Sequence, residues 1–334
     1  METNPNWGAI LNSDILEGKS ILITGGTGSL GSHFIKHILK HNKPRKVICY
    51  SRDELKQSIL REELSSYCSP GGQMRFLIGD IRDKDRLEWA FRDVNIVIHS
   101  AAMKQVPACE YNPEEAIKTN IDGTKNIVNA LKDTVVSKAI FISSDKAVLP
   151  LNHYGKTKAV GESLWIASNV MRPIFSCTRW GNIEGSRGSI IPVFKDKIKR
   201  GERITITDLE MTRFSTSFKD AISTIFQALS YPSGLIWCRK SPSYVMSLVA
   251  AAFGTVCDIV GPRPMEKTDE TLVSEFEVPR AMDIGNEIYI KPDPPFDYEI
   301  DYELGGIPLS KPYNSYTNPD YLTVDQIKDR IRNA

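Results

Sequence analysis

Residues 20–41, SILITGGTGSLGSHFIKHILKH, decide the fold. A β-branched apolar run leads into three glycines spaced three apart, Gly25, Gly28 and Gly31, and then into an amphipathic helix pattern. Glycine there permits a tight turn, a close approach of backbone to a pyrophosphate, and close packing of helix on strand. The free N–H groups at the start of the helix favour an anion. The stretch predicts a dinucleotide site, with a purely structural turn as the alternative.

Apolar runs of strand length recur through the first half of the chain, at 46–50, 74–79, 94–100, 138–143 and 174–179. Continuous apolar runs of this length suit strands that are covered on both faces. Helical patterns lie between them, for example at 112–133. This alternation predicts an α/β fold, a Rossmann-like doubly wound parallel sheet.

The alternation breaks after about residue 180, where Gly and Pro become frequent and the strands shorten. Residues 292–312 are too rich in proline for regular structure. We therefore expect a cofactor-binding Rossmann domain over 19–180 and a smaller, partly interleaved substrate-binding lobe over 181–330. We expect the helix at 217–231 to pack back on the first domain.

Composition excludes several classes of function. The 334 residues carry a net charge of +1, so no basic field points to nucleic acid. No apolar run reaches the length of a membrane span, and the first residues lack the pattern of a secretory signal. The six cysteines contain no C-x-x-C pair and indicate free thiols in a reducing compartment. We expect a cytoplasmic protein that does not bind membranes.

The end of the second apolar run carries information on the cofactor. An NAD site would place a carboxylate there for the ribose diol. Here Ser51 and Arg52 come first, and a cation suits the 2′-phosphate of NADP. We therefore favour NADP; NAD remains the alternative if Arg52 is only a surface residue. The predicted cofactor-binding residues are Thr24, Gly25, Thr27, Gly28, Ser29, Leu30, Gly31, Ser51, Arg52, Lys56, Asp80, Ile81, Ala101, Ala102, Lys104, Tyr154 and Lys158.

Three histidines, His33, His37 and His41, repeat every four residues on the first predicted helix. H-x-x-x-H can bind zinc, but H-E-x-x-H is absent and no carboxylate follows nearby. We interpret them as a polar helix face and expect no metal.

An acid, two lysines and a phenol crowd into residues 143–158, SSDKAVLPLNHYGKTK, after the fifth apolar run. Tyr154 and Lys158 stand four apart, on one face of a helix. A lysine beside a phenol favours the phenolate, so Tyr154 could accept a proton from an alcohol while hydride leaves for nicotinamide.

At this point the chain resembles the extended short-chain dehydrogenase/reductases. More narrowly, it is similar to the soluble UDP-N-acetylglucosamine 4,6-dehydratases of the C5-inverting, pseudaminic acid type. The resemblance runs from residue 21 to about 216 and rests on TGGTGSLG, YSRDELKQ, GDIRD, AAMKQVPACEYNPEEAIKTNI, SSDKAVLPLNHYGKTK, RWGNIEGSRGSIIP and ITDLEMTRFS.

The chain departs from the family pattern in a few places. Ser144 replaces a threonine and keeps the hydroxyl, Gln105 replaces a histidine, and Ser215 replaces a tryptophan. The family's RPGEKLHE appears as RPMEKTDE at 263–270, so the C-terminal third matches more loosely.

The resemblance implies roles for the acid–base segment. Tyr154 would take the C4 hydroxyl proton as hydride passes to NADP⁺, Lys146 would remove the C5 proton, and Asp145 would protonate the departing C6 hydroxyl. Hydride then returns to C6. These roles need a protonated Asp145 and a neutral Lys146. The predicted catalytic residues are Ser144, Asp145, Lys146, Tyr154 and Lys158.

Cations in the second half suit a substrate diphosphate, and the resemblance implies a UDP-sugar that is bound by a homo-oligomer. Salt bridges within the lobe are the alternative for each arginine. The predicted substrate-binding residues are Lys104, Asn182, Arg187, Thr207, Arg213, Arg263 and Glu266. Two other functions stay open: a nucleotide-sugar 4-epimerase or reductase, which normally lacks the Asp-Lys pair, and a non-catalytic NADP-sensing protein, which would more readily have lost Tyr154 or Lys158.

Overall fold

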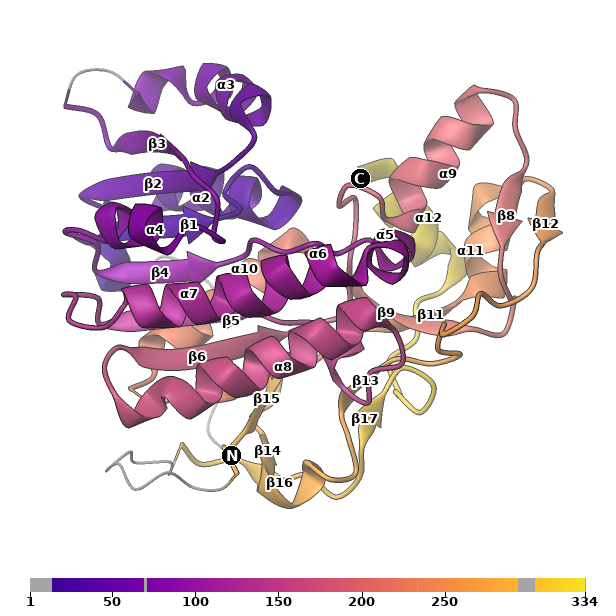
Figure 1. Cartoon of the computed structure of the whole chain (residues 1–334). Coiled ribbons are helices and arrows are strands. Elements are labelled where there is room, and N and C mark those ends of the chain that lie inside the picture. Colours follow the sequence, from indigo (N-terminus) through magenta and orange to yellow (C-terminus); the bar gives the residue numbers. More distant parts are fainter. Residues whose placement is uncertain (1–13, 69–70, 233, 294–303, 334) are drawn as a thin grey trace.

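The computed structural model describes residues 14–68, 71–232, 234–293 and 304–333 (Figure 1). Within these residues, ten strands form one sheet in the order β16-β14-β15-β10-β6-β5-β4-β1-β2-β3. The pairs from β3 to β10 are parallel, and β15, β14 and β16 continue the sheet antiparallel. The parallel strands are β1 (Ser20–Thr24), β2 (Lys46–Ser51), β3 (Met74–Ile78), β4 (Ile96–His99), β5 (Lys138–Ile142), β6 (Ile174–Arg179) and β10 (Ile236–Arg239); the antiparallel strands are β14 (Ala281–Asp283), β15 (Glu287–Ile290) and β16 (Ile307–Pro308).

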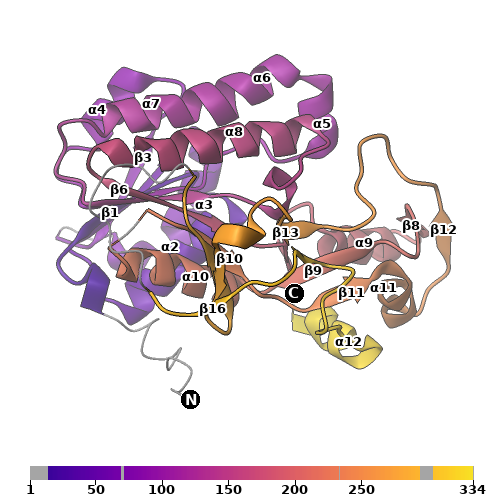
Figure 2. The same ribbon diagram turned by 90° about the horizontal axis from the view of Figure 1, so that it is seen from below.

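The Rossmann-like α/β fold expected from the sequence is confirmed. Helices cover both faces of the sheet, with α4, α7 and α8 on one side and α2 and α10 on the other (Figure 2). Ile21 and Ile23 of β1 join the core under α2 and α10, whereas Leu22 joins the core under α4, α7 and α8. Both faces of the parallel sheet are therefore shielded from water, which explains why the strands are continuous apolar runs in the sequence. The helices are α2 (Ser29–His41), α3 (Glu54–Glu63), α4 (Lys84–Ala90), α5 (Val106–Tyr111), α6 (Pro113–Ile117), α7 (Gly123–Ala130), α8 (His153–Ala167) and α10 (Phe218–Ser230).

The predicted helix at 112–133 is not one uninterrupted α-helix. A π-helical turn, η3 (Lys118–Asp122), separates α6 from α7. Single 3-10 turns lie elsewhere along the chain, at η1 (Asp14–Leu16), η2 (Ser65–Tyr67), η4 (Asp145–Ala147), η5 (Ser168–Val170) and η6 (Val278–Arg280).

A smaller lobe lies beyond the carboxyl ends of the parallel strands (Figure 1). Its apolar core includes Phe194, Ile204, Tyr244 and Ile327. The elements beyond the main sheet are α9 (Ile190–Lys199), α11 (Met246–Phe253), α12 (Val324–Asn333), β7 (Asn182–Ile183), β8 (Ile204–Ile206), β9 (Thr212–Thr216), β11 (Ser243–Val245), β12 (Cys257–Ile259), β13 (Thr271–Val273) and β17 (Tyr313–Asn314). No helix among the described residues is both long and apolar enough to cross a bilayer.

The lobe and the sheet are interleaved along the chain. After β9 the chain returns through α10, whose Ile222, Ile225 and Phe226 lie in the core beside α2. It then adds β10 parallel to β6. A boundary at residue 180 stays a prediction, because strands from both sides of it form the main sheet. Of the proline-rich segment, residues 294–303 lie outside the described part, and β16 forms a short edge strand after them.

A buried ion cluster joins α8, β6 and the segment before η6. Arg179 at the end of β6 is 4% exposed. Its guanidinium donates to Glu162 Oε2 at 2.9 Å and to Glu277 Oε1 at 2.8 Å. It also donates to the carbonyl of Leu272 at 3.1 Å. Two buried carboxylates are therefore neutralised by one cation.

We expect Arg179→Met to destabilise the fold by about 3–5 kcal/mol at neutral pH, because it leaves two carboxylates buried without their cation. Burial raises the pKa of Glu277, but Arg179 and the hydrogen bonds from Ser274 together lower it by more, so the net pKa lies below its usual value. The stabilisation is therefore present above the unfolded-state pKa and is lost as the pH falls. The difference in the free energy of unfolding between Arg179→Met and the unchanged protein should become smaller at acidic pH. Urea unfolding at several pH values measures it.

Arg200→Met is the matched control, because Arg200 pairs with Asp196 and Glu202 at the exposed end of α9. An exposed pair contributes about 0–1 kcal/mol. If both variants lost the same free energy of unfolding, the buried cluster would contribute no more to stability than the exposed ion pairs.

Candidate active site

A cavity of about 690 Å³ lies between the carboxyl ends of the parallel strands and the lobe. The β1–α2 turn, the end of β5, the start of α8 and the first residues of the lobe all contribute to its lining. Predicted residues that line it are Gly28, Ser29, Leu30, Lys56, Ala102, Lys104, Ser144, Asp145, Lys146, Tyr154, Lys158, Asn182, Arg187, Arg213, Arg263 and Glu266. The other predicted residues are not among the lining residues: Thr24, Gly25, Thr27, Gly31, Ser51, Arg52, Asp80, Ile81, Ala101 and Thr207. The Thr207 hydroxyl lies 3.4 Å from the sulfur of Met211.

The β1–α2 turn requires glycine for steric reasons. Gly25 has a φ of +66°, and a Cβ there would lie 2.8 Å from the backbone of Ala101. A Cβ on Gly31 would lie 2.6 Å from the carbonyl oxygen of Gly25. Helix α2 begins at Ser29, and its N-cap Gly28 offers no side-chain oxygen. The first N–H groups of α2 are thus available to an anion in the cavity.

Below this turn, β1 is tied to β4 by a buried histidine. Thr24 Oγ1 lies 2.8 Å from His99 Nδ1, and His99 Nε2 lies 3.0 Å from Thr124 Oγ1. Burial, followed by the charge of Lys158, lowers the pKa of His99 well below its usual value. The neutral imidazole fixes the strand ends that carry the glycine turn.

The end of β2 presents cations and hydroxyls. Thr27 Oγ1 lies 2.9 Å from Ser51 Oγ, and the half-exposed Arg52 lies 3.6 Å from Asp80. Burial raises the pKa of Asp80, but Arg82 and Arg52 lower it by more, so this carboxylate is held charged. Asp53 is occupied as the N-cap of α3, where it accepts from the backbone N–H of Lys56 at 2.9 Å.

The histidines of α2 lie away from this cavity lining. The ring of His33 stacks on Phe218 with centroids 3.6 Å apart, and the rings of His37 and His41 lie 4.8 Å apart. Within the described residues, no group of three His, Cys, Asp or Glu side chains is placed to hold a metal ion.

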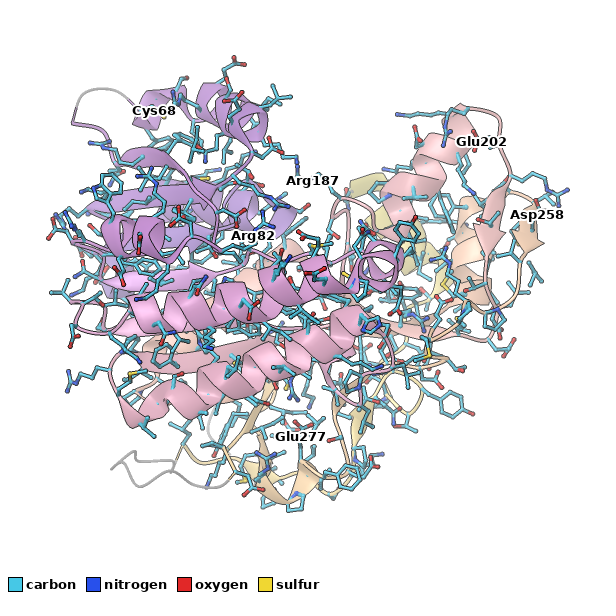
Figure 3. All side chains as sticks on the ribbon, viewed as in Figure 1. Cys68, Arg82, Arg187, Glu202, Asp258 and Glu277 are labelled. Carbon is cyan, nitrogen blue, oxygen red and sulfur yellow. The ribbon has the colours of Figure 1, made fainter. Side chains whose placement is uncertain are left out.

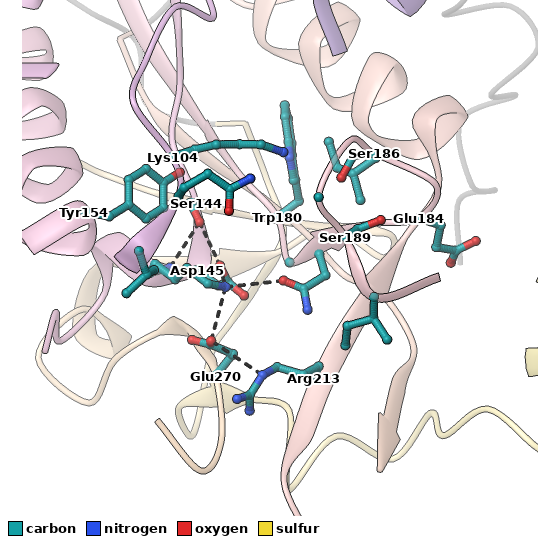
Figure 4. A pocket seen from close by; sticks show the side chains of 18 of the residues that line it. Lys104, Ser144, Asp145, Tyr154, Trp180, Glu184, Ser186, Ser189, Arg213 and Glu270 are labelled. Atoms are coloured by element: carbon teal, nitrogen blue, oxygen red, sulfur yellow. Dashed lines mark hydrogen bonds and ion pairs between the residues drawn. The ribbon is translucent and has the colours of Figure 1, made fainter. Parts of the chain in front are cut away.

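Lys146 makes most of the contacts within the acid–base segment. Figure 4 shows Ser144, Asp145 and Tyr154 on one side of the cavity and Glu270 close to Asp145. Lys146 Nζ lies 3.2 Å from Asp145 Oδ1, 3.3 Å from Asn182 Oδ1 and 3.2 Å from Glu270 Oε1. The Ser144 hydroxyl donates to Asp145 Oδ1 at 2.7 Å and accepts from the backbone N–H of Lys146. Burial lowers the pKa of Lys146, but Asp145 and Glu270 raise it by more, so its net pKa lies above the usual value. The resting group is an ammonium ion.

Tyr154 reaches the same cavity from the first turn of α8. Asn152 caps this helix by accepting from the N–H of Gly155 at 2.8 Å. A Cβ on Gly155 would lie 2.2 Å from the carbonyl oxygen of Lys146, so the helix lies directly against the η4 turn. This contact brings the phenol beside Ser144 and Lys146.

Lys158, which was expected to favour the phenolate, is not among the groups that shift the pKa of Tyr154 here, so its role stays a prediction. Burial raises the pKa of Tyr154 to about 12; the strongest opposing effect is the charge of Lys146, and a hydrogen bond with Ser144 also lowers it. Lys158 instead donates to the carbonyl of Ile142 and lies 3.8 Å from the centroid of the Phe141 ring. Burial lowers the pKa of Lys158 to about 7.

Arg187 lies at the junction of sheet and lobe and contacts the glycine turn (Figure 3). Its backbone N–H donates to Ser29 Oγ at 3.0 Å, and its guanidinium donates to the carbonyl of Thr27. We expected Arg187 to serve the substrate diphosphate, but these contacts are with the β1–α2 turn. Burial, then Arg187 and Lys146, lower the pKa of nearby Lys104.

Arg213 and Arg263 are held on the lobe side. The Arg213 guanidinium donates to the carbonyls of Thr268 at 2.8 Å and Lys267 at 2.9 Å. The backbone N–H of Arg263 donates to Glu266 Oε2 at 3.1 Å. The stretch that differs most from the family pattern thus forms one wall of the cavity.

Sequence reasoning missed several lining residues, namely Trp180, Glu184, Tyr244, Glu270 and Arg330. Arg330 of α12 pairs with Glu184 and donates to Ser215 Oγ at 3.2 Å. Ser215, where the family pattern has tryptophan, therefore leaves room for an ion pair. The sequence offered one indication that Glu270 belongs to the site, namely its place in the RPMEKTDE stretch. It offered no such indication for Arg330.

Comparison with known proteins agrees with this geometry. A UDP-N-acetylglucosamine 4,6-dehydratase (inverting) of Campylobacter jejuni is 39% identical, over 96% of this chain and 99% of the relative. A UDP-glucose 4-epimerase of Rickettsia bellii is 37% identical, over 94% and 96%. The X-ray structure of Pen from Bacillus thuringiensis superposes with a TM-score of 0.85 and 32% identity, over 95% and 98%.

The model of the polysaccharide biosynthesis protein family matches residues 21–292, which include the glycine turn and the whole acid–base segment. The chain therefore belongs to this family of extended short-chain dehydrogenase/reductases.

Proposed function

We propose that the chain dehydrates UDP-N-acetylglucosamine to a UDP-2-acetamido-2,6-dideoxy-4-keto-hexose with inversion at C5. The observation that carries the proposal is the meeting of Tyr154, Lys146 and Asp145 in one cavity with a dinucleotide turn. The similar Campylobacter jejuni dehydratase supports it.

A nicotinamide cofactor held at the β1–α2 turn would supply hydride transfer, from C4 of the sugar and back to C6. Tyr154 accepts the C4 hydroxyl proton as a phenolate, the form that the Lys146 charge favours against burial. The resulting ketone acidifies C5–H. Lys146 removes the C5 proton, and Asp145 gives a proton to the departing C6 hydroxyl. Tyr154, protonated by the C4 step, would donate its proton to C5 from the opposite face, which gives inversion.

The resting ion pair can provide the protonation states that this scheme needs. Lys146 donates an N–H to Asp145 Oδ1 at 3.2 Å. Transfer of that proton gives an amine and a carboxylic acid without any exchange with solvent. A sugar that expels water from the cavity favours the neutral pair, because desolvation disfavours charged forms.

A 4-epimerase is the other function to weigh, because the Rickettsia bellii relative bears that name. Epimerisation at C4 needs the phenol and the hydride acceptor but neither a base at C5 nor an acid at C6. The buried Asp145 and the Lys146 ammonium therefore favour dehydration.

The cofactor in this proposal is NADP. Arg52, Ser51 and Thr27 lie together at the end of β2, while the first carboxylate after it, Asp53, caps α3. We propose that Arg52 pairs with the 2′-phosphate. We also propose that the protein works in the cytoplasm as a homo-oligomer.

The deciding experiment is incubation with UDP-N-acetylglucosamine in heavy water. We expect loss of one water by mass spectrometry, deuterium at C5, and proton couplings of a β-L-arabino 4-keto sugar. A C4 epimer of unchanged mass would support the epimerase, and an unchanged sugar would support the sensing protein.

We expect Tyr154→Phe to abolish the transient absorbance of reduced nicotinamide in a single turnover, because no group accepts the C4 proton. Lys146→Ala should still oxidise C4 but stall before water leaves. Stopped-flow absorbance and quenched-flow mass spectrometry separate the two steps. Tyr111→Phe, at a tyrosine that is 88% exposed, is the control and should behave as the unchanged protein. Normal dehydration by Lys146→Ala would assign the base to another residue.

We expect Arg52→Ala to weaken NADP binding about ten- to a hundredfold while NAD binding stays the same, because a charge-assisted contact contributes about 1.5–3 kcal/mol. Fluorescence titration with each cofactor measures it. Arg45→Ala is the control: Arg45 lies just before β2, at the opposite end, and donates to the carbonyl of Asp93. Equal loss of NADP and NAD binding would remove Arg52 from the 2′-phosphate site.

We expect Gly25→Ala to weaken binding of both dinucleotides at least about tenfold, since its Cβ would displace the backbone of Ala101 that faces the turn. Gly18→Ala is a closely matched control, because Gly18 has the same φ of +66° but open space around it. Calorimetric titration distinguishes them. Similar losses in both would mean that backbone strain, and not the close approach, controls binding.

A further inference from the structure

Glu270 occupies a position that the proposed chemistry has not yet used. It lies immediately before β13 and is 3% exposed. Its Oε1 lies 3.2 Å from Lys146 Nζ, which also contacts Asp145 and Asn182. Lys146 is therefore held by oxygens from three separate segments, and Glu270 is the one contributed from the far wall of the cavity (Figure 4).

The backbone of Glu270 is fixed independently of Lys146. Its N–H donates to Ser315 Oγ at 2.9 Å, and its carbonyl accepts from the N–H of Ser315 at 2.8 Å. The segment that carries β17 thus holds the carboxylate at the cavity wall. The position of Glu270 does not rely on the ion pair that it makes.

The Glu270 side chain is not explained by stabilisation of the fold alone. Its Oε2 is buried and has no hydrogen-bond partner in the described structure, although Lys267 Nζ lies 4.0 Å away. Arg213, 3.9 Å from Oε1, already has carbonyl partners in Thr212, Thr268 and Lys267. Burial of an incompletely bonded carboxylate costs free energy, so its retention beside Lys146 calls for a role there.

Lys146 is surrounded by charges of both signs. Asp145 and Glu270 are the carboxylates that raise its pKa against the effect of burial, and Arg213 lowers it. The charged or titratable groups that face Lys146 are Asp145, Glu270, Tyr154, Arg213, Lys104, Lys267 and Tyr244. Of the two carboxylates, Asp145 is assigned to the C6 hydroxyl, whereas the proposed chemistry assigns no proton transfer to Glu270.

We propose that Glu270 is a positioning residue for Lys146: it holds the amine at the sugar and stabilises the ammonium ion that forms when Lys146 removes the C5 proton. The inference rests on the proposed role of Lys146 as the base. In this step the C5–H bond breaks and an N–H bond forms on Lys146. The electron pair becomes the C5–C6 double bond, and the C6 hydroxyl leaves as water with a proton from Asp145. Glu270 neither gains nor loses a proton.

The test is Glu270→Gln, which keeps the shape and an acceptor oxygen but removes the charge. Single turnovers with UDP-N-acetylglucosamine are followed across pH, with reduced-nicotinamide absorbance for C4 oxidation and quenched mass spectrometry for loss of water. We expect C4 oxidation at the rate of the unchanged protein. In the pH profile of the elimination rate, the low-pH limb should move to lower pH by about one unit or more, because loss of the Glu270 charge makes Lys146 easier to deprotonate. The plateau should fall about tenfold, because the amine is a weaker base.

Two further variants separate positioning from simple support of the fold. Glu270→Asp keeps the charge, so its limb should stay near that of the unchanged protein while its plateau falls. Glu277→Gln is the matched control: Glu277 is also buried beside an arginine, but it pairs with Arg179 and not with Lys146. Its limb should not move, whatever its melting temperature.

Two outcomes overturn the inference while the dehydratase function stands. One is a folded Glu270→Gln variant whose low-pH limb in the elimination profile does not move. The other is a Glu270→Asp variant whose limb moves as far as that of Glu270→Gln. Failure of the unchanged protein to eliminate water overturns the proposed function and the inference with it.

Discussion

The ammonium group of Lys146 joins parts of the chain that are far apart in sequence. Its partners come from η4 after β5, from β7 and from the residue before β13. These segments meet on one cation at the wall of the cavity. A buried ammonium group without partners would cost free energy. The three oxygens around Lys146 therefore both compensate its charge and hold it in place.

The protein buries two clusters of charge with opposite composition. Around Arg179, one cation lies between two carboxylates, and each of its three guanidinium nitrogens has a hydrogen-bond partner. Around Lys146, polar atoms are left without partners, including Asp145 Oδ2 and Glu270 Oε2. The arrangement around Arg179 suits a structural contact that holds α8, β6 and the segment before η6 together. The arrangement around Lys146 leaves bonding capacity for a substrate and for protons that move.

The sequence was sufficient for features that depend on local patterns. The strand runs predicted from 20–24 to 174–179 and the helix at Ser29–His41 were recognisable because each contains closely spaced apolar residues, most of which are buried. Strand β3 is the least buried of them, with Ile78 exposed. The glycine turn was recognisable because its constraints are steric and local. The stretch 143–158 identified the acid–base groups because they lie on adjacent residues.

The rest depends on contacts between distant segments, which no local pattern encodes. Glu270 meets Lys146 across more than a hundred residues, and Arg187 folds onto Thr27 and Ser29 instead of facing the lobe alone. The raised pKa of Tyr154 follows from burial, which spacing along a helix cannot reveal. Strands of two or three residues, such as β7 and β16, are too short to leave a periodic signal.

The order of elements along the chain has a consequence for biosynthesis. The glycine turn and strands β1 to β6 leave the ribosome before any of the lobe, and domains form from the N-terminal side during translation. Arg330 of α12, which lines the same cavity, emerges well over a hundred residues after Lys146. Helix α10, which covers one face of the sheet beside α2, emerges only after α9, β8 and β9 of the lobe. One face of the cofactor-binding sheet therefore stays partly uncovered until part of the lobe has been made.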